Sequence, residues 1–346
     1  MFAERLAALF NEQERKIKTR YYASYADPAF IPIHLTGGIG DVIAARPVLE
    51  KLSGEYRIAC YSAHYEAFNY FSETLKALPE PMPNFSWHLE FNVVARFRFT
   101  DQFDGFLIPA HQELFQSQKR IFQKSPIIKT FVTEHPHHDA ALARYSQAYG
   151  LNRIDFPLYS LGLDPYVNIV RPTRLRVDPV ITLHDGYDTT NWSDISGRAT
   201  KQWKWEHWNR LVQMLKKEFP HLQICQLGAK TGREIDGVDY QLINKTTITE
   251  AFDILKRSML HIDGDSGLVH AATSLKVPCV VMFGPTPDYF YGYPENTNLR
   301  ANTCADACYW LTDNWMTKCP IGHSGPKCMD EITPEQVFGA ARARLK

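Results

Sequence analysis

The sequence predicts an α/β protein with two doubly wound, Rossmann-like domains. Strand-like apolar runs alternate with amphipathic helical patterns in two separate parts of the chain, and a proline-containing stretch without periodicity lies between those parts. The chain of 346 residues is also long for a single hydrophobic core. We therefore expect an N-terminal domain over residues 1–170 and a C-terminal domain over residues 171–346.

The N-terminal half contains a predicted strand-helix-strand unit. An amphipathic helical pattern over residues 1–22 comes first, and it lacks the uninterrupted apolar core of a signal peptide. Apolar runs at 31–35 and 56–61 then predict strands, and the pattern over 41–52 predicts the helix between them. Strands joined by a helix in this way are expected to be parallel.

The rest of the N-terminal half is less regular. Residues 78–129 are aromatic and irregular, and no topology follows from their sequence. A helical pattern occupies 137–151. The predicted linker is 158–178, where prolines and mixed polarity replace periodicity.

In the C-terminal half, strands and helices alternate clearly. The predicted strands cover 180–186, 222–229, 259–265 and 278–285, and the predicted helices cover 204–219, 247–258 and 266–275. Thr247 and Glu250 have the spacing of a capping box at the start of one helix. This alternation is typical of a doubly wound parallel sheet.

Ligands of open parallel sheets bind beyond the carboxyl ends of the strands. Four glycine-containing loops occupy such positions, at 36–41, 184–188, 228–232 and 263–267. After the first loop, TGGIGD, Ile43 stands where a dinucleotide fingerprint needs its third glycine, and the Gly-Lys-Ser/Thr ending of a P-loop is also missing. What remains is a glycine turn followed by Asp41, which is either a helix cap or a functional carboxylate. Spacing does not decide between these two roles.

Composition and charge exclude several classes of protein. With 45% hydrophobic and 22% charged residues, the chain is typical of a folded globular protein. Lys plus Arg and Asp plus Glu number 38 each, so no net field favours nucleic acid as a partner. Because no uncharged apolar run reaches the length of about 18 residues that a membrane span needs, we expect a cytoplasmic protein. Its seven cysteines are then expected to be thiols or metal ligands rather than disulfides.

Four segments resemble, in the same order, those of glycosyltransferase family 9, the ADP-heptose:lipopolysaccharide heptosyltransferases and their relatives. They are GGIGDVIAARPVL, TKQWKWEHWNRLVQMLKKEFPHLQICQLGA, HIDGDSGLVHAATSLKVPCVVMFGPTP and CMDEITPEQV. The likeness covers roughly 31–52 and nearly all of 180–340. It implies the GT-B architecture, in which two Rossmann-like domains face each other across a cleft, with the acceptor mainly on the N-terminal side and the nucleotide-sugar on the C-terminal side.

The resemblance also implies roles for individual residues. Asp41 falls on the carboxylate regarded as the general base of the family, and Lys201 falls on a lysine that contacts the donor phosphates. DSGLVH matches the Asp-Thr-Gly-Leu-x-His element of the donor site, with Ser in place of the more common Thr. The other residues that we expect to bind the donor are Asp265, Ser266, Gly267, His270 and Gly228, and the expected acceptor or phosphate loop contains Gly37, Gly38 and Gly40.

The chain departs from the family pattern in two places. Some members carry a basic residue or small hydroxyls in the first loop, where this chain has Leu35, Gly37 and Gly38. The donor-contacting acid that often follows the GA strand end has no clear counterpart, because alignment offers Gly232 or Glu234.

General chemistry agrees with the implied roles. An inverting glycosyl transfer needs a carboxylate, such as Asp41, to take the proton from the acceptor hydroxyl. Without a metal, charge on the departing diphosphate must be met by a cation such as Lys201 and by backbone N–H groups at a helix N-terminus. The resemblance implies ADP-heptose as the default donor, no cofactor for catalysis, and lipopolysaccharide core, another glycan or a protein as acceptor. Any contact with the inner membrane would be peripheral.

Each candidate also has an ordinary structural explanation. Lys201 is equally well explained as a solvated residue beside a helix, and His270 as a buried, hydrogen-bonded histidine. Asp265 has the alternative role of a helix cap. Two further groups are expected to be structural rather than to bind ligands: Trp203, Trp205 and Trp208 as packing residues, and Arg96 and Arg98 as exposed strand residues.

Four cysteines gather in the segment 304–328. Cys304, Cys308, Cys319 and Cys328 are separated by 3, 10 and 8 residues, and thiols at such separations can close a tetrahedral metal site, with His323 as a substitute ligand. Similar clusters occur in family 9 relatives, and in the autotransporter heptosyltransferases they form a metal-bearing finger. A structural zinc or iron and plain reduced thiols are therefore equal alternatives here. The histidines of HPHHD, at 135–139, are expected in a solvated turn.

Two other functions stay open at this point. One is a different Rossmann-type enzyme that modifies nucleotide-sugars, which the missing third glycine disfavours. The other is a catalytically inactive relative that binds a glycan or a protein partner through the aromatic region 85–115. The joint presence of Asp41, Lys201 and Asp265 favours the enzyme.

Overall fold

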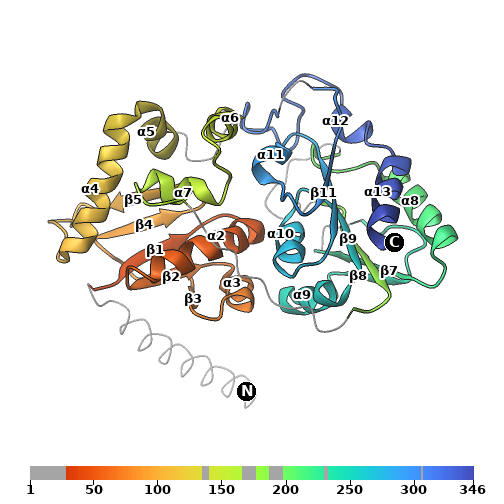
Figure 1. Ribbon diagram of the computed structural model, residues 1–346, viewed down its shortest axis with the longest axis horizontal. Helices are drawn as coiled ribbons and strands as arrows, with labels where there is room; N and C mark the ends of the chain where they lie inside the picture. The colour runs from red at the N-terminus through yellow and green to blue at the C-terminus, as the bar shows by residue number, and fades with distance from the viewer. Residues whose placement is uncertain (1–28, 135–139, 166–176, 187–197, 230–232, 305–306) are drawn as a thin grey trace, which may run out of the picture.

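The computed structural model describes residues 29–134, 140–165, 177–186, 198–229, 233–304 and 307–346. The predicted helix at 1–22 and the turn at 135–139 lie outside these ranges, as does most of the predicted linker. The described part of the chain forms two open sheets, each with helices packed on it (Figure 1). The α/β prediction is therefore confirmed, whereas the domain boundary near residue 170 stays a prediction.

The first sheet belongs to the N-terminal half and has five strands in the order β3-β2-β1-β4-β5. Its strands are β1 (Ile31–Leu35), β2 (Ile58–Ser62), β3 (Ala77–Pro79), β4 (Trp87–Phe91) and β5 (Ala95–Phe99). Its helices are α2 (Ile39–Ser53), α3 (Tyr65–Phe71), α4 (Pro109–Lys124), α5 (Pro126–Thr133), α6 (Ala140–Ala148) and α7 (Asp155–Ser160). Strands β1 and β2 are parallel, as the strand-helix-strand pattern predicts. Residues 158–160, predicted as the start of the linker, instead complete α7.

The aromatic region that had no predicted topology contains an antiparallel pair, β4 and β5. Aromatic rings from β5, the following turn and helix α4 pack on one another, with Phe97 of β5 and Phe115 of α4 centred 5.0 Å apart. Arg96 and Arg98 both form ion pairs with Glu90 across this strand pair, at 2.6 and 3.0 Å. Their partners within the sheet favour a structural role over contact with an anionic acceptor.

The second sheet belongs to the C-terminal half, and its six strands are all parallel, in the order β11-β10-β9-β6-β7-β8. They are β6 (Val180–Leu183), β7 (Gln223–Gly228), β8 (Tyr240–Ile243), β9 (Leu260–Gly264), β10 (Cys279–Phe283) and β11 (Thr297–Arg300). Its helices are α8 (Trp205–Glu218), α9 (Ile248–Arg257), α10 (Gly267–Ser274), α11 (Asp288–Tyr291), α12 (Lys327–Asp330) and α13 (Pro334–Leu345). The capping box of Thr247 and Glu250 is present. The edge strands β8 and β11 were not predicted, because each has only four residues and a mixture of polar and apolar side chains.

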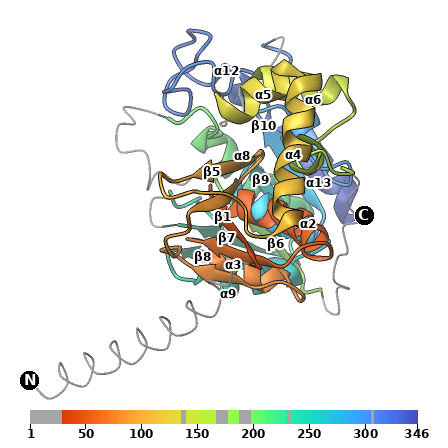
Figure 2. The ribbon, with the colours of Figure 1, turned by 90° about the vertical axis from the view of Figure 1, so that its left-hand side faces the viewer.

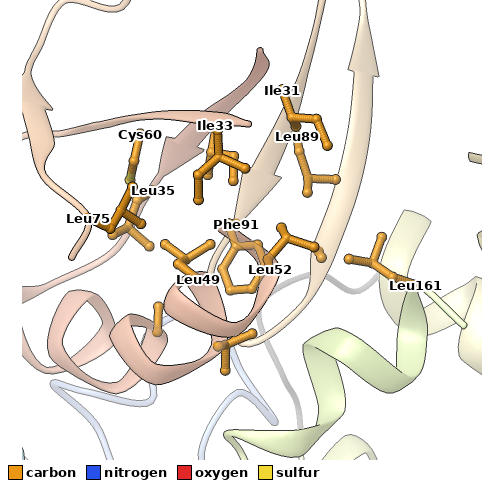
Figure 3. Close-up of a cluster of buried hydrophobic side chains, with 14 of the residues drawn as sticks. Ile31, Ile33, Leu35, Leu49, Leu52, Cys60, Leu75, Leu89, Phe91 and Leu161 are labelled. Carbon is orange, nitrogen blue, oxygen red and sulfur yellow. The ribbon is translucent and has the colours of Figure 1, made fainter. Parts of the chain in front are cut away.

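Helix α2 is the element that joins the two cores. Leu49 on this helix packs against β1 and β4 of the N-terminal sheet, next to Phe91 (Figure 3). Ile43, on the other side of the helix, packs with Phe252 and Val269 from the C-terminal half. Figure 1 shows α2 beside α10, where the two sheets' helices meet. Figure 2 views the molecule from the side of the N-terminal half. A helix buried on two sides explains why the run Val42–Leu49 is almost entirely apolar.

The three tryptophans of the WKWEHW stretch, at 203–208, pack as expected. Trp203 and Trp208 are buried with their rings 5.0 Å apart, and the Trp203 indole N–H donates to the Ile332 carbonyl at 2.7 Å. Trp205 packs at the edge of the same core, beneath the guanidinium of Arg233. None of the helices in the described ranges is long and apolar enough to cross a membrane.

Candidate functional site

A cleft of about 970 Å³ lies between the two halves of the chain. All four loops that were selected at strand carboxyl ends contribute residues to its lining, within the part of each loop that the structure describes. The predicted site residues on this lining are Gly37, Gly38, Gly40, Asp41, Lys201, Gly228, Asp265, Ser266, Gly267 and His270. The fold thus brings together residues that are more than 200 positions apart in the sequence.

The first loop places Asp41 at the start of α2. The helix begins at Ile39 and its N-cap is Gly38, so Asp41 is the third helical residue rather than the cap itself. One carboxylate oxygen accepts the Gly38 backbone N–H at 2.7 Å. Gly37 has φ +99°, and a Cβ there would lie 2.5 Å from the Asp41 carboxylate. Glycine at this position therefore leaves room for the carboxylate, which caps the helix and also faces the cleft.

Arg153, just before α7, is the main functional candidate that the sequence did not reveal. Its guanidinium forms an ion pair with the second carboxylate oxygen of Asp41 and lies 3.0 Å from His270 Nε2. It also stacks over the Tyr291 ring, 5.1 Å from the centroid. Burial lowers the pKa of Arg153, but Asp41 and other nearby groups outweigh burial and leave the pKa raised. The guanidinium is thus a permanent cation that links the two halves of the chain.

Lys201 and Asp265 form a buried ion pair in the C-terminal half of the cleft. The Lys201 ammonium lies 2.7 Å from the Asp265 carboxylate and donates to the Asp265 carbonyl at 2.9 Å. Burial raises the pKa of Asp265, but the positive charge of Lys201 outweighs it and lowers the pKa below its usual range. Lys201 is therefore not a solvated helix-flanking residue, and the Asp265 carboxylate stays ionised near neutral pH.

The N-terminus of α10 lies next to this pair. Its N-cap is Ser266, not Asp265, and the Ser266 hydroxyl accepts the Leu268 N–H at 3.2 Å. Backbone N–H groups at a helix N-terminus favour anions, since the helix dipole adds partial positive charge there. The loop therefore presents an ammonium group and oriented N–H donors to the same part of the cleft.

His270 on α10 is both buried and part of the cleft lining. Its Nδ1 lies 2.7 Å from the Tyr293 hydroxyl and its Nε2 faces Arg153. Burial and the nearby charge of Arg153 lower the pKa of His270 to about 3. The imidazole is thus neutral at physiological pH and fixes Arg153 by hydrogen bonding rather than by charge.

A second layer of buried polar groups supports the strand ends. Asp263 at the end of β9 is fully buried and contacts His184 Nδ1 at 3.0 Å, His261 Nε2 at 3.1 Å and the Ser266 hydroxyl at 2.5 Å. Burial raises the pKa of Asp263, but the two histidines lower it to about 2. The ionised carboxylate thus holds His184, which lines the cleft, and Ser266 in place.

The two halves approach each other at glycines. A Cβ on Gly40 would lie 2.5 Å from His270 Cδ2 and 3.1 Å from the Gly267 Cα, and a Cβ on Gly267 would lie 3.2 Å from the Gly40 nitrogen. Only residues without a side chain let the N-termini of α2 and α10 come this close.

Replacing Gly40 by Ala is therefore expected to lower the free energy of unfolding by about 1–3 kcal/mol, since His270 is buried and held by two partners. Chemical denaturation would measure this change. Gly339→Ala is a matched control, because nothing lies within 4 Å of an added Cβ there and, at this exposed position of helix α13, alanine should raise the free energy of unfolding by up to about 1 kcal/mol. Equal stability of Gly40→Ala and the wild type would show that this close approach is not maintained.

The prediction of a metal at the four cysteines is not supported. The thiols lie close enough to raise one another's pKa, and burial with this mutual effect raises the pKa of Cys308 to about 12 and of Cys328 to about 11. Cys308 and Cys328 are therefore neutral thiols. Within the described residues, no three or more His, Cys, Asp or Glu side chains are arranged to hold a metal ion. The sequence emphasised these cysteines, whereas residues between them line the cleft: the aromatic Tyr309, Trp310 and Trp315, together with Met316.

Comparison with known proteins supports the resemblance seen in the sequence. Residues 189–313 match the model of glycosyltransferase family 9 (heptosyltransferase). A stretch of 105 residues is 33% identical to lipooligosaccharide heptosyltransferase 2 of Campylobacter jejuni subsp. jejuni serotype O:2, which is 30% of this chain and 31% of the relative. The matched part thus spans about a third of the length of this curated relative.

Solved structures resemble nearly the whole chain. TibC, an iron-containing dodecameric glycosyltransferase from enterotoxigenic E. coli H10407, has a TM-score of 0.60 at 15% identity, covering 91% of this chain and 76% of that chain. A glycosyltransferase family 9 protein from Veillonella parvula DSM 2008 has a TM-score of 0.50 at 15% identity, covering 92% and 97%. At these identities the likeness establishes the fold, and the predicted GT-B architecture is confirmed.

Proposed function

We propose that this chain, which resembles glycosyltransferase family 9, is an inverting glycosyltransferase that moves a sugar from a nucleotide-sugar to a hydroxyl acceptor. One observation carries the proposal. The carboxylate of Asp41 from one half of the chain and the Lys201–Asp265 pair beside the N-terminus of α10 from the other half line the same cleft. A base and an anion site that face each other are what such a transfer requires.

In the proposed mechanism, Asp41 accepts the proton of the acceptor hydroxyl as its oxygen attacks the anomeric carbon. The nucleoside diphosphate leaves from the opposite face of the sugar, and its developing charge is met by Lys201 and by the N–H groups of Ser266 and Gly267. Arg153 holds the Asp41 carboxylate in one orientation. These steps use side chains and backbone groups of this chain, and none passes through the cysteine-rich segment.

ADP-heptose is the donor that we propose first. The curated relative is named a lipooligosaccharide heptosyltransferase, and one structure of TibC, with a TM-score of 0.56, contains ADP-D-beta-D-heptose. The proposed acceptor is a hydroxyl of lipopolysaccharide core, of another glycan or of a protein. Because acceptors of the family bind mainly on the N-terminal side, this choice depends on the half of the chain that lies outside the family match at 189–313.

Calorimetric binding of ADP, GDP, UDP and CDP tests the proposal. We expect the wild type to prefer one nucleotide, and Lys201→Ala to weaken its binding by about 10- to 100-fold, the effect of losing one charged hydrogen bond. Asp265→Ala should also weaken binding, because Asp265 positions the Lys201 ammonium. Lys216→Ala is a matched control, since Lys216 forms a similar ion pair with Asp239 on the surface, at 2.7 Å.

The outcomes separate the proposed enzyme from a binding protein. A folded wild type that binds none of the four nucleotides would contradict the transferase and favour an inactive relative that binds a glycan or a protein. Equal losses in Lys201→Ala and Lys216→Ala would show that the buried pair is not the donor site.

A further inference from the structure

The cysteine-rich segment places one aromatic side chain, Trp310, in an unusual position. Trp310 is half-buried, lines the cleft and has φ +55°. A positive φ is rare for a large residue, and such strained positions persist where the surrounding structure imposes them, often at ligand sites. The residue therefore calls for an explanation beyond packing.

Hydrogen bonds hold the backbone of the cysteine-rich segment in place on both sides of Trp310. The backbone N–H groups of Cys308 and Tyr309 both donate to the Pro285 carbonyl, at 3.0 and 3.1 Å, just beyond the end of β10. On the other side, the Thr200 hydroxyl donates to the Trp315 carbonyl at 2.9 Å, next to the ion-paired Lys201. Trp310 thus sits on a rigid support that is anchored to the phosphate-binding part of the cleft.

Trp310 packs against side chains from both halves of the chain. The Trp310 and Trp315 rings are 5.8 Å apart, and both belong to an apolar cluster that includes Ala140 and Ala143 of α6. Because α6 belongs to the N-terminal half, the cluster joins the cysteine-rich segment to the half that carries Asp41 and Arg153. Figure 1 shows α6 beside this segment, near α11.

The order of strands sets the order of sites along the cleft. The carboxyl ends of β8 and β10 are four strand spacings apart in the order β10-β9-β6-β7-β8, which is about 19 Å. Near β7 and β8 the lining includes Leu227, Gly228, Asn244 and Ile248, which suit a nucleoside. The helix N-terminus of α10 lies between the two ends, because it follows β9.

The opposite end of the cleft contains the groups expected to contact the reacting sugar. Asp41 is paired with Arg153, which stacks on Tyr291 of α11, the helix that follows β10. The Tyr291 and Tyr309 rings are 5.5 Å apart, and Tyr309 precedes Trp310. A nucleotide-sugar has its diphosphate between nucleoside and sugar, so a diphosphate at α10 with the nucleoside near β8 places the sugar at the β10 end.

We propose that Trp310 is a specificity-determining residue that stacks on the sugar ring of the nucleotide-sugar donor. This inference rests on the proposed function and assigns the donor-sugar contact to the cysteine-rich segment. The indole supplies a broad, rigid apolar face for the C–H groups of one side of the ring, and its fixed backbone means that little conformational freedom is lost on binding.

The test compares the nucleoside diphosphate selected by the binding panel with its heptose or hexose conjugate. In Trp310→Gly, we expect the ratio of the two Kd values to move against the conjugate by about tenfold, while the diphosphate alone binds as in the wild type. Glycine is the suitable truncation because it accepts φ +55° without strain. Trp310→Phe, which retains a stacking face, should recover most of the lost affinity.

Trp205→Ala is the matched control, since Trp205 packs at the edge of the core outside the cleft lining. It should leave the Kd ratio unchanged. An unchanged ratio in Trp310→Gly, with normal diphosphate binding, would overturn the inference, and so would slower transfer at an unchanged ratio, which would assign Trp310 to the acceptor. Failure of the wild type to bind any nucleoside diphosphate would instead contradict the proposed function itself.

Discussion

Replacing Asp41 by Asn is expected to lower the transfer rate, kcat, by about 10²- to 10⁴-fold, the usual contribution of a general base. Asn keeps the size of the side chain and can still accept the Gly38 N–H, so the helix cap survives. It cannot accept the proton of the acceptor hydroxyl. Release of nucleoside diphosphate from the preferred nucleotide-sugar, with core oligosaccharide as acceptor, measures the effect.

Two further measurements show whether the loss concerns proton transfer. Nucleotide Kd should change little in Asp41→Asn, because Lys201 and the N-terminus of α10 are untouched. Asp164→Asn is the control, since Asp164 forms an exposed ion pair with Lys51 at 3.1 Å, away from the cleft lining. If Asp41→Asn transferred sugar at the wild-type rate, Asp41 would be a helix cap only.

Replacing Arg153 by Ala is expected to lower kcat by about 10²-fold, because a small displacement of a catalytic group has an effect of this size. The guanidinium contacts Asp41 and His270 together, and its removal frees the carboxylate to rotate. Arg153→Lys should recover only part of the activity, since an ammonium group does not have the planar fork that reaches two partners. Kinetic assays of the three proteins test this expectation.

Chemical rescue distinguishes orientation from general stability. Guanidinium at low, non-denaturing concentration should restore part of the activity of Arg153→Ala, by occupying the space of the lost side chain. Arg257→Ala is the matched control, since Arg257 forms an Arg–Asp pair with Asp178 on the surface. A folded Arg153→Ala protein with wild-type kcat would contradict the positioning role.

Periodic patterns in the sequence were sufficient for most of the second sheet. The strands β6, β7, β9 and β10 are rich in apolar residues and buried along most of their length, because a parallel sheet is covered on both faces. The three-residue strand β3 was missed because it is too short to show a pattern, and strands β4, β5, β8 and β11 were missed for two other reasons. The first pair lies in a region with too many aromatic residues for a clear alternation, and the second pair consists of short edge strands with half-buried side chains.

The sequence predicted those parts of the candidate site that consist of a glycine-containing loop followed by a helix. The loops at 36–41 and 263–267 were found because a glycine turn that leads into a helix has a recognisable sequence, and the structure places both on the cleft. Arg153 and Trp310 have no such local signal, and His184 was not singled out within its glycine-containing loop at 184–188. Each is defined by what the fold places opposite it, which is Asp41 for Arg153 and Asp263 for His184.

The sequence by itself determined the alternation of strands and helices, the glycine loops at the strand ends and the likeness to family 9, since these depend on residues that are near one another in the chain. Only the tertiary structure decided that Asp41 is paired with Arg153 and that Lys201 forms an ion pair with Asp265. It also decided that the aromatic residues of the cysteine-rich segment line the cleft. The physical reason is that ion pairs and cleft walls form between side chains more than 60 residues apart, and packing rather than spacing brings such groups into contact.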